Sequence, residues 1–301
     1  MGYTAHCEVC VKISESIPKR KRPFYSLEFF PPKEPEQWPS FFSVVEKLKA
    51  LDPLFASVTY GAGGGTQDNT LEIAAKIKAV GIEPLPHLTC VGATSSRLKD
   101  FLSRLQKAGM ENVLALRGDA PKDTEHWDWS AGEFSSALDL VTFVRQEFPD
   151  FGMGVAGYPA PHPEAESFQA DRAYTKAKLD AGGEFVITQL FFDVREYMDM
   201  VERLRENGVT KPVIPAILPV QSLESIRRVL SLCGASIPGY FYLELEEANN
   251  KGGSEAVKDA GIRFAAGQIR RLIDYGAPGV HLYTLNRAET CLRLAEVVGK
   301  L

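Results

Sequence analysis

The feature that most constrains the fold is a regular alternation along the chain. Short apolar runs rich in β-branched and aromatic residues recur, and each is followed by a polar loop and a stretch with helical periodicity. Eight such runs are present, at 23–30, 55–60, 83–90, 112–119, 153–159, 185–192, 212–219 and 279–286. Helical stretches follow at 41–51, 70–81, 95–109, 137–148, 171–182, 194–208 and 222–234, several of them ending on Gly.

This alternation predicts an α/β fold with parallel strands and right-handed crossovers. Eight units in 301 residues favour a single-domain (β/α)8 TIM barrel over an open doubly wound sheet. The glycines at 61–65 lack the G-x-G-x-x-G spacing that a Rossmann unit requires. We therefore expect the barrel over residues 23–301, preceded by an N-terminal extension over 1–22, with an irregular insertion at 237–261 before the last helix.

Composition excludes several classes of partner. The net charge is −5 and no basic stripe with interleaved aromatic residues is present, which argues against nucleic acid. No apolar run is long enough to span a membrane, and the basic cluster Lys19–Arg22 has no apolar segment or cleavage site of a secretory signal beside it. We expect a cytoplasmic protein.

The five cysteines are dispersed, which is typical of reduced thiols. Cys7 and Cys10 form a C-x-x-C pair, but no second such pair accompanies it, so a structural or incidental role is favoured over a zinc or redox site. No metal-binding motif is found elsewhere, and we expect no metal.

Polar residues gather at the ends of the strand-like runs. Because a (β/α)8 enzyme builds its site at the C-terminal ends of its strands, these residues are predicted to line one mouth. They are Glu28, Thr59, His87, Thr89, Arg117, Asp119, Tyr158, Gln189, Tyr283 and Asn286.

Glu28 lies in the first run, within the sequence YSLEFFPPK. Side chains alternate along a strand, so Ser26 and Glu28 share one face while Tyr25, Leu27 and Phe29 share the other. If the apolar set packs on the helices, Glu28 points into the barrel near its mouth, where partial desolvation favours the protonated form that a general acid needs. A structural pairing with a barrel Arg, or a solvent-facing position, explains the residue equally well from this pattern.

The other strand-end residues also have two explanations each. Arg117 and Asp119 share a face across Gly118, which allows a backbone to approach a ligand closely, but a local ion pair explains the charges as well. His87 is either a donor to a phosphate or ring, or a structural histidine.

Two further pairs follow the fifth strand-like run. Tyr158 and His162 lie in a proline-stiffened loop that suits a planar ligand, although such loops also occur for structural reasons. Asp171 and Lys178 are seven apart on one helical face that can reach ribose and phosphate, and a solvated charged face is the default alternative.

Eight short strings occur in a fixed order from Phe24 to the C-terminus: SLEFFPPK, SVTYGAGG, PHLTC, ALRGD, VAGYP with HPEA, ITQLFFD, ILPV and YTLNRAE. Together they resemble the methylenetetrahydrofolate reductase family. The resemblance implies a (β/α)8 barrel that binds FAD non-covalently. It also implies hydride transfer from NADH or NADPH through the flavin to methylenetetrahydrofolate, giving methyltetrahydrofolate for one-carbon metabolism and methionine biosynthesis.

The resemblance also implies roles for individual residues. Glu28 matches the family's general acid, which protonates N10 of the folate, and Asp119 matches the catalytic aspartate between the flavin and the pterin. On the substrate side it implies Gln189, Phe191, Tyr283 and Arg287. On the cofactor side it implies Thr59, Tyr60, His87, Leu116, Arg117, Gly118, Asp119, Tyr158, His162, Asp171 and Lys178.

Three positions depart from the pattern of many members: Ser136, Tyr174 and Val229. The first two leave open a flavin-independent transfer from NADH to the same folate, and an accessory barrel of a one-carbon complex is a further alternative. We also expect a homo-oligomer, and we expect it to lack the C-terminal regulatory domain of eukaryotic members and its feedback inhibition by S-adenosylmethionine.

Overall fold

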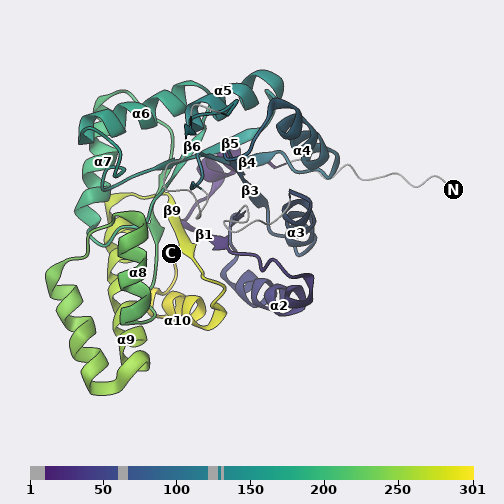
Figure 1. Ribbon diagram of the computed structural model, residues 1–301. Helices are drawn as coiled ribbons and strands as arrows, with labels where there is room; N and C mark the ends of the chain where they lie inside the picture. The colour runs from purple at the N-terminus through teal and green to yellow at the C-terminus, as the bar shows by residue number, and fades with distance from the viewer. Residues whose placement is uncertain (1–10, 60–66, 121–127, 130–131) are drawn as a thin grey trace.

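The computed structural model describes residues 11–59, 67–120, 128–129 and 132–301. In this part of the chain, parallel strands form a nearly closed barrel with helices packed around it (Figure 1). The strands are β1 (Phe24–Phe29), β2 (Ala56–Val58), β3 (Pro84–Thr89), β4 (Asn112–Leu116), β5 (Gly152–Gly157), β6 (Phe185–Thr188), β7 (Val213–Ile214), β8 (Ala216–Ile217) and β9 (Gly279–Tyr283). Their order is β7-β6-β5-β4-β3-β2-β1-β9-β8, which confirms the (β/α)8 prediction.

The helices lie close to the stretches with helical periodicity. They are α1 (Ile13–Ser16), α2 (Trp38–Leu48), α3 (Gln67–Ala79), α4 (Ser95–Lys107), α5 (Ala137–Glu147), α6 (Phe168–Asp180), α7 (Val194–Glu206), α8 (Leu223–Cys233), α9 (Gly239–Tyr275) and α10 (Ala288–Val298). Short 3-10 turns occur at Ile17–Lys19, Pro35–Gln37 and Lys49–Leu51. No helix in the described ranges is both long and apolar enough to cross a membrane.

The barrel closes through a strand that is divided at Pro215. The first half of this run, β7, pairs with β6, and the second half, β8, pairs with β9. Proline has no N–H to give to a ladder, so pairing breaks at this residue. The Pro215 carbonyl still accepts a hydrogen bond from the His281 amide at 2.9 Å, and the amide of Ala216 donates to Thr188 Oγ1 at 2.9 Å. The single strand predicted over 212–219 is therefore two short strands, one paired with β6 and the other with β9.

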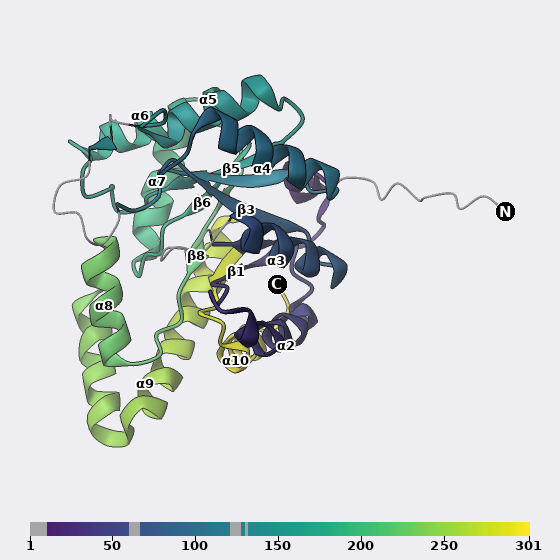
Figure 2. The same cartoon turned by 45° about the vertical axis from the view of Figure 1, so that its right-hand side comes forward.

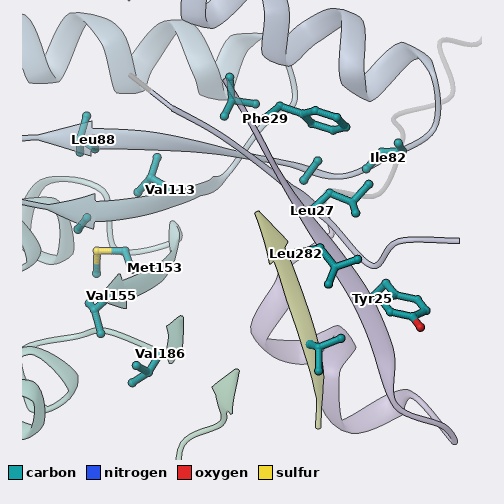
Figure 3. Close-up of a cluster of buried hydrophobic side chains, with 14 of the residues drawn as sticks. Tyr25, Leu27, Phe29, Ile82, Leu88, Val113, Met153, Val155, Val186 and Leu282 are labelled. Atoms are coloured by element: carbon teal, nitrogen blue, oxygen red, sulfur yellow. The ribbon is translucent and has the colours of Figure 1, made fainter. Parts of the chain in front are cut away.

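Residues of β1 alternate between the two sides of the barrel wall, as predicted. Tyr25, Leu27 and Phe29 belong to the apolar core between strands and helices, where Figure 3 shows them in line with Leu282 of β9. Glu28 faces the interior, where its carboxylate meets Ser57 of β2. The position of the acid thus follows from strand parity and from the burial of its apolar neighbours.

The lower interior of the barrel is filled by apolar side chains. Phe24, Phe55 and Phe185 pack there with Ile13 and Ile17 from the segment before β1. A hydrogen bond to a side chain also holds this segment, since the Ile13 amide donates to Asn112 Oδ1 at 3.1 Å. Glu28, one residue before the end of β1, lies toward the other end of the barrel, the mouth.

The expectation of an irregular insertion at 237–261 was wrong, because this stretch is helical. It belongs to α9, in which two helices meet at a kink where Gly252 and Gly253 leave helical geometry. The two halves form a hairpin beside α8 (Figures 1 and 2). Phe241 stacks on Phe264 across the hairpin with ring centroids 3.5 Å apart. Gly has a low helix propensity and the residues around the Gly-Gly pair are polar, so no helical pattern is visible in this stretch of the sequence. Packing across the hairpin stabilises the two helices instead.

Candidate active site at the barrel mouth

The end of β1 is fixed by the loop that follows β9. The Glu28 carbonyl accepts hydrogen bonds from the Thr284 hydroxyl at 2.6 Å and from the Thr284 amide at 3.3 Å. In the strand register Glu28 lies beside Ser57 on one side and Tyr283 on the other. The backbone of the acid is therefore tied to both neighbouring strands.

The Glu28 carboxylate is buried, with 6% of the residue exposed. Its Oε2 accepts a hydrogen bond from Ser57 Oγ at 3.3 Å, and it lies 3.6 Å from His87 Nε2 and 3.7 Å from His281 Nε2. No Arg or Lys among the described residues forms an ion pair with it. The structure thus surrounds this acid with a hydroxyl and two imidazoles rather than with a barrel Arg.

His87 lies on β3, where burial lowers its pKa. The Glu28 carboxylate opposes this shift and His281 adds to it. In the described part of the chain His87 Nε2 has no hydrogen-bond partner, and its distance to Glu28 Oε2 exceeds a good hydrogen bond. His87 is therefore a neutral imidazole with an unsatisfied nitrogen, which suits contact with a bound group.

At the mouth, Gln189 from the end of β6 meets Tyr283 of β9. The Tyr283 hydroxyl donates to Gln189 Oε1 at 3.3 Å, and the Leu190 amide donates to the same oxygen at 2.9 Å. Burial raises the pKa of Tyr283 well above its ordinary value, and the nearby Glu28 carboxylate adds to this shift. The phenol stays protonated and fixes the amide, so the Gln189 NH2 group is the part left to donate to a ligand.

Arg117 and Asp119 lie just beyond β4. Arg117 forms a two-pronged ion pair with Glu164 at 2.6 and 2.9 Å, and its guanidinium lies 4.4 Å from the ring centroid of Trp129. Asp119 is exposed, and no ion pair joins it to Arg117 in the described residues. Gly118 has φ +83°, and a Cβ there would lie 3.1 Å from Thr89 Cβ, so only glycine suits this bend.

Asp171 and Lys178 are buried on one face of α6, so the alternative of a solvated charged face was wrong. Asp171 accepts from Arg172 at 2.9 Å and from the His162 amide at 3.2 Å. Lys178 Nζ donates to the Ala156 carbonyl at 2.5 Å. Burial lowers the Lys178 pKa to about 8, although Asp171 opposes the shift.

Tyr158 and His162 lie against each other in the loop after β5, with ring centroids 4.9 Å apart. Burial lowers the pKa of His162, with Arg117 adding to this shift. Burial likewise raises the pKa of Tyr158 to about 12. The loop thus presents two neutral aromatic rings beside the Arg117 and Asp171 groups.

Not every residue that the sequence singled out reaches this cluster. Phe191 is fully buried in the core, stacked on Tyr197 with centroids 5.9 Å apart. Arg287 is exposed at the start of α10, while Thr59 and Leu116 are half-buried at the ends of β2 and β4. Tyr60, Cys7 and Cys10 lie outside the described residues.

The unusual residues Ser136 and Tyr174 have local structural partners. Ser136 is the N-cap of α5 and forms a capping box with Asp139. The Tyr174 hydroxyl accepts from the Leu138 amide at 3.3 Å, and its ring lies 4.9 Å from Lys178 Nζ. Val229 packs on the apolar cluster between α8 and α9.

His281 is not among the predicted strand-end residues, because it lies in the middle of β9. It is completely buried. It contacts Ser26 and Ser57 besides Glu28. The signal was present in the sequence, because His281 and Tyr283 share strand parity and both face the interior. Among the described residues no group of His, Cys, Asp and Glu is arranged to hold a metal ion.

The fold and this cluster define a (β/α)8 barrel with a buried acid and neutral donors at the C-terminal mouth, the place where barrels of this class carry their sites. Comparison with known proteins adds the family. The sequence profile described as methylenetetrahydrofolate reductase matches residues 12–299. The chain belongs to the methylenetetrahydrofolate reductase family.

Relatives from several kingdoms are similar. Methylenetetrahydrofolate reductase (NADH) 1 of Arabidopsis thaliana is 36% identical over 95% of this chain and 50% of its own length. The 5,10-methylenetetrahydrofolate reductase of Escherichia coli is 36% identical over 91% of this chain and 90% of its own. The chain therefore spans about half the length of the plant relatives and most of the bacterial one.

A solved structure shares the fold. It is an uncharacterized protein from Clostridium thermocellum, described as binding two copies of 5-methyl-5,6,7,8-tetrahydrofolic acid. It has a TM-score of 0.68 at 15% identity and covers 95% of this chain and 97% of its own. At this identity the likeness supports the barrel fold alone.

Proposed function

We propose that this chain reduces methylenetetrahydrofolate to methyltetrahydrofolate with a hydride from NADH or NADPH that passes through FAD. Membership of the family supports the reaction class. The observation that carries the proposal is Glu28, a buried acid at the mouth with neutral or polar partners and no cationic ion-pair partner in the described residues.

Glu28 acts as the general acid in this proposal. When the bond between the methylene carbon and N10 breaks, its electron pair goes to N10, which takes the proton from Glu28. The carbon then accepts the hydride, so the substrate gains one proton and one hydride. Gln189, whose amide oxygen is held by Tyr283, orients the substrate through its NH2 group.

Residues of β3, of α6 and of the loop after β4 fit FAD. His87 offers an unsatisfied nitrogen, and the guanidinium of Arg117 and ammonium of Lys178 are suited to a diphosphate. In this proposal Asp171 accepts hydrogen bonds from ribose hydroxyls, and the exposed Asp119 contacts the ring system. The bound flavin supplies the two-step hydride transfer, and the protein supplies position and electrostatics.

Arg117 must exchange Glu164 for a diphosphate in this proposal. Glu164 is largely exposed, so separating the pair costs little. The choice between the two nicotinamides is open to experiment, since relatives are named for NADH in Arabidopsis thaliana and for NADPH in Caenorhabditis elegans.

The test of the proposed function uses the full chain reconstituted with FAD under anaerobic conditions. NADH or NADPH, each added in turn, should bleach the flavin, and methylenetetrahydrofolate should restore its colour with formation of methyltetrahydrofolate. A flavin-independent enzyme would instead form the product with no FAD present, and a chain that forms none in either condition contradicts the proposal.

A further inference from the structure

His281 occupies the centre of β9 with no exposed surface, opposite Ser26 in the register of β1 and β9. Its ring stacks on Phe55 with centroids 5.8 Å apart and an angle of 20°. Tyr283 meets the same ring edge-on at 5.9 Å. Aromatic packing therefore fixes the orientation of the imidazole, and both of its nitrogens face polar groups of neighbouring strands.

These polar groups form a chain that ends on Glu28. Nδ1 of His281 lies 2.9 Å from Ser26 Oγ. Nε2 lies 3.3 Å from Ser57 Oγ and 3.7 Å from Glu28 Oε2. Ser57 Oγ is also 3.3 Å from Glu28 Oε2, so this hydroxyl stands between the imidazole and the acid.

The direction of the hydrogen bonds follows from Ser57, whose single hydroxyl proton is donated to Glu28 Oε2. Ser57 Oγ therefore accepts from Nε2–H of His281, and Nδ1 is left to accept from the Ser26 hydroxyl. That hydroxyl lies 2.9 Å from Nδ1 and 3.4 Å from the Val280 carbonyl, so the bond to Nδ1 is the shorter of its two contacts.

We propose that His281 is a positioning residue for Glu28, because it orients Ser57 and through this hydroxyl holds the carboxyl in place. This inference rests on the proposed function, because it requires Glu28 as the acid. Ser26 sets the imidazole tautomer from the far side of the ring.

Other titratable groups also face the pair. His87 from β3 approaches the same Glu28 oxygen at 3.6 Å, and Tyr283 lies on β9 itself. The Tyr283 hydroxyl is turned to Gln189. The experiment therefore changes His281 and Ser57 and leaves His87 and Tyr283 in place.

The main variant is His281→Gln in the full chain with FAD. The Gln amide reaches the place of Nε2 and can turn an N–H toward Ser57, so it keeps the hydrogen bond that orients this hydroxyl. We expect kcat for folate reduction to stay within about threefold of the wild-type value, whereas His281→Asn should lose about tenfold. The KM for the folate should change by less than about threefold, and flavin bleaching by NADH should be unchanged. A kcat as low in His281→Gln as in His281→Asn overturns the inference.

Two further measurements keep the test decisive if this variant fails to fold. Ser57→Ala removes only the bridging hydroxyl, and we expect kcat for folate reduction to fall by about tenfold with flavin bleaching intact. His281→Asn is the matched control, because it can still bond Ser26 but is too short to reach Ser57, and it should lose rate as Ser57→Ala does. Equal rates for the wild type and Ser57→Ala contradict the inference.

A readout independent of activity is the ¹⁵N spectrum of histidine-labelled protein. The signal lost in His281→Gln or His281→Asn should belong to a ring protonated on Nε2 with Nδ1 as acceptor, and a ring protonated on Nδ1 alone overturns the proposed chain. A wild-type chain that never reduces the folate contradicts the proposed function instead, and the spectrum still decides the tautomer.

Discussion

Asn286 holds both backbone polar groups of Phe30. Its Oδ1 accepts from the Phe30 amide at 3.1 Å and its Nδ2 donates to the Phe30 carbonyl at 2.6 Å. Asn286 itself has φ +56°, a left-handed conformation that Asn tolerates better than most residues. Because prolines follow at positions 31 and 32, no regular ladder can continue, and this side chain replaces it at the end of the strand that carries Glu28.

Replacing Asn286 should separate the contribution of its two hydrogen bonds from that of its left-handed backbone conformation. Asn286→Gly keeps the backbone conformation and loses the two hydrogen bonds, so the free energy of unfolding should fall by about 1–3 kcal/mol. Asn286→Ala should lose about 1 kcal/mol more, because Ala is strained at positive φ. Urea unfolding midpoints measure both variants. If Asn286→Gly, Asn286→Ala and the wild type are equally stable, the two hydrogen bonds of Asn286 contribute nothing to stability.

Glu28→Gln should separate the two halves of the catalytic cycle. Without a proton to donate, folate reduction should fall by about 10²–10⁴-fold, while bleaching of the flavin by NADH stays within about twofold. Stopped-flow absorbance of the flavin measures each half separately.

The matched control is Glu83→Gln. Glu83 is another poorly exposed glutamate, but it bonds Asn112 and Lys78 away from the acid. It should leave both half-reactions unchanged. Loss of both half-reactions in Glu28→Gln, with the control intact, argues against an acid role.

Lys178 should make stability depend on pH. Burial lowers its pKa from 10.5 to about 8 in the folded protein, so the folded state releases this proton before the unfolded chain does. Between these values the unfolded state binds more protons, and the free energy of unfolding therefore rises with pH. Relative to Lys178→Met, the wild type should gain up to about 3 kcal/mol across this window. Urea unfolding on either side of the window measures it, and a constant difference contradicts the account.

Arg117 should contribute to FAD affinity. Arg117→Met keeps an unbranched aliphatic chain but removes the charged guanidinium, and we expect FAD to bind at least about tenfold more weakly. Fluorescence titration of the flavin measures this. In the control, Glu164→Gln, the competing partner is lost, so FAD should bind no more weakly than to the wild type, and stability should change by less than about 1 kcal/mol. Unchanged affinity in Arg117→Met removes this residue from the cofactor site.

Much of the fold follows from local patterns. Alternating strand and helix signals predict the barrel, and the parity of β1 places Glu28 inside it, because both depend on periodicity alone. The division of one strand at Pro215 and the helical hairpin of α9 depend on partners distant in sequence. The hairpin in particular is stabilised by packing, which no local pattern encodes.

The site was predictable where a strand continues and not beyond it. His281 was overlooked because it lies in mid-strand, although parity with Tyr283 identifies it. Phe191 was placed with Gln189, but β6 ends at Thr188, so alternation no longer holds and the ring turns into the core. The ion pair of Arg117 with Glu164 joins separate loops, and only the tertiary structure brings it together.

The most direct test of the central claim is an absorbance spectrum of the purified full chain, incubated with FAD and then freed of excess. The account predicts an oxidised flavin spectrum that NADH or NADPH bleaches without oxygen and that methylenetetrahydrofolate restores in proportion to the methyltetrahydrofolate formed. A protein that retains no flavin, or whose reduced flavin is not reoxidised by the folate, contradicts it.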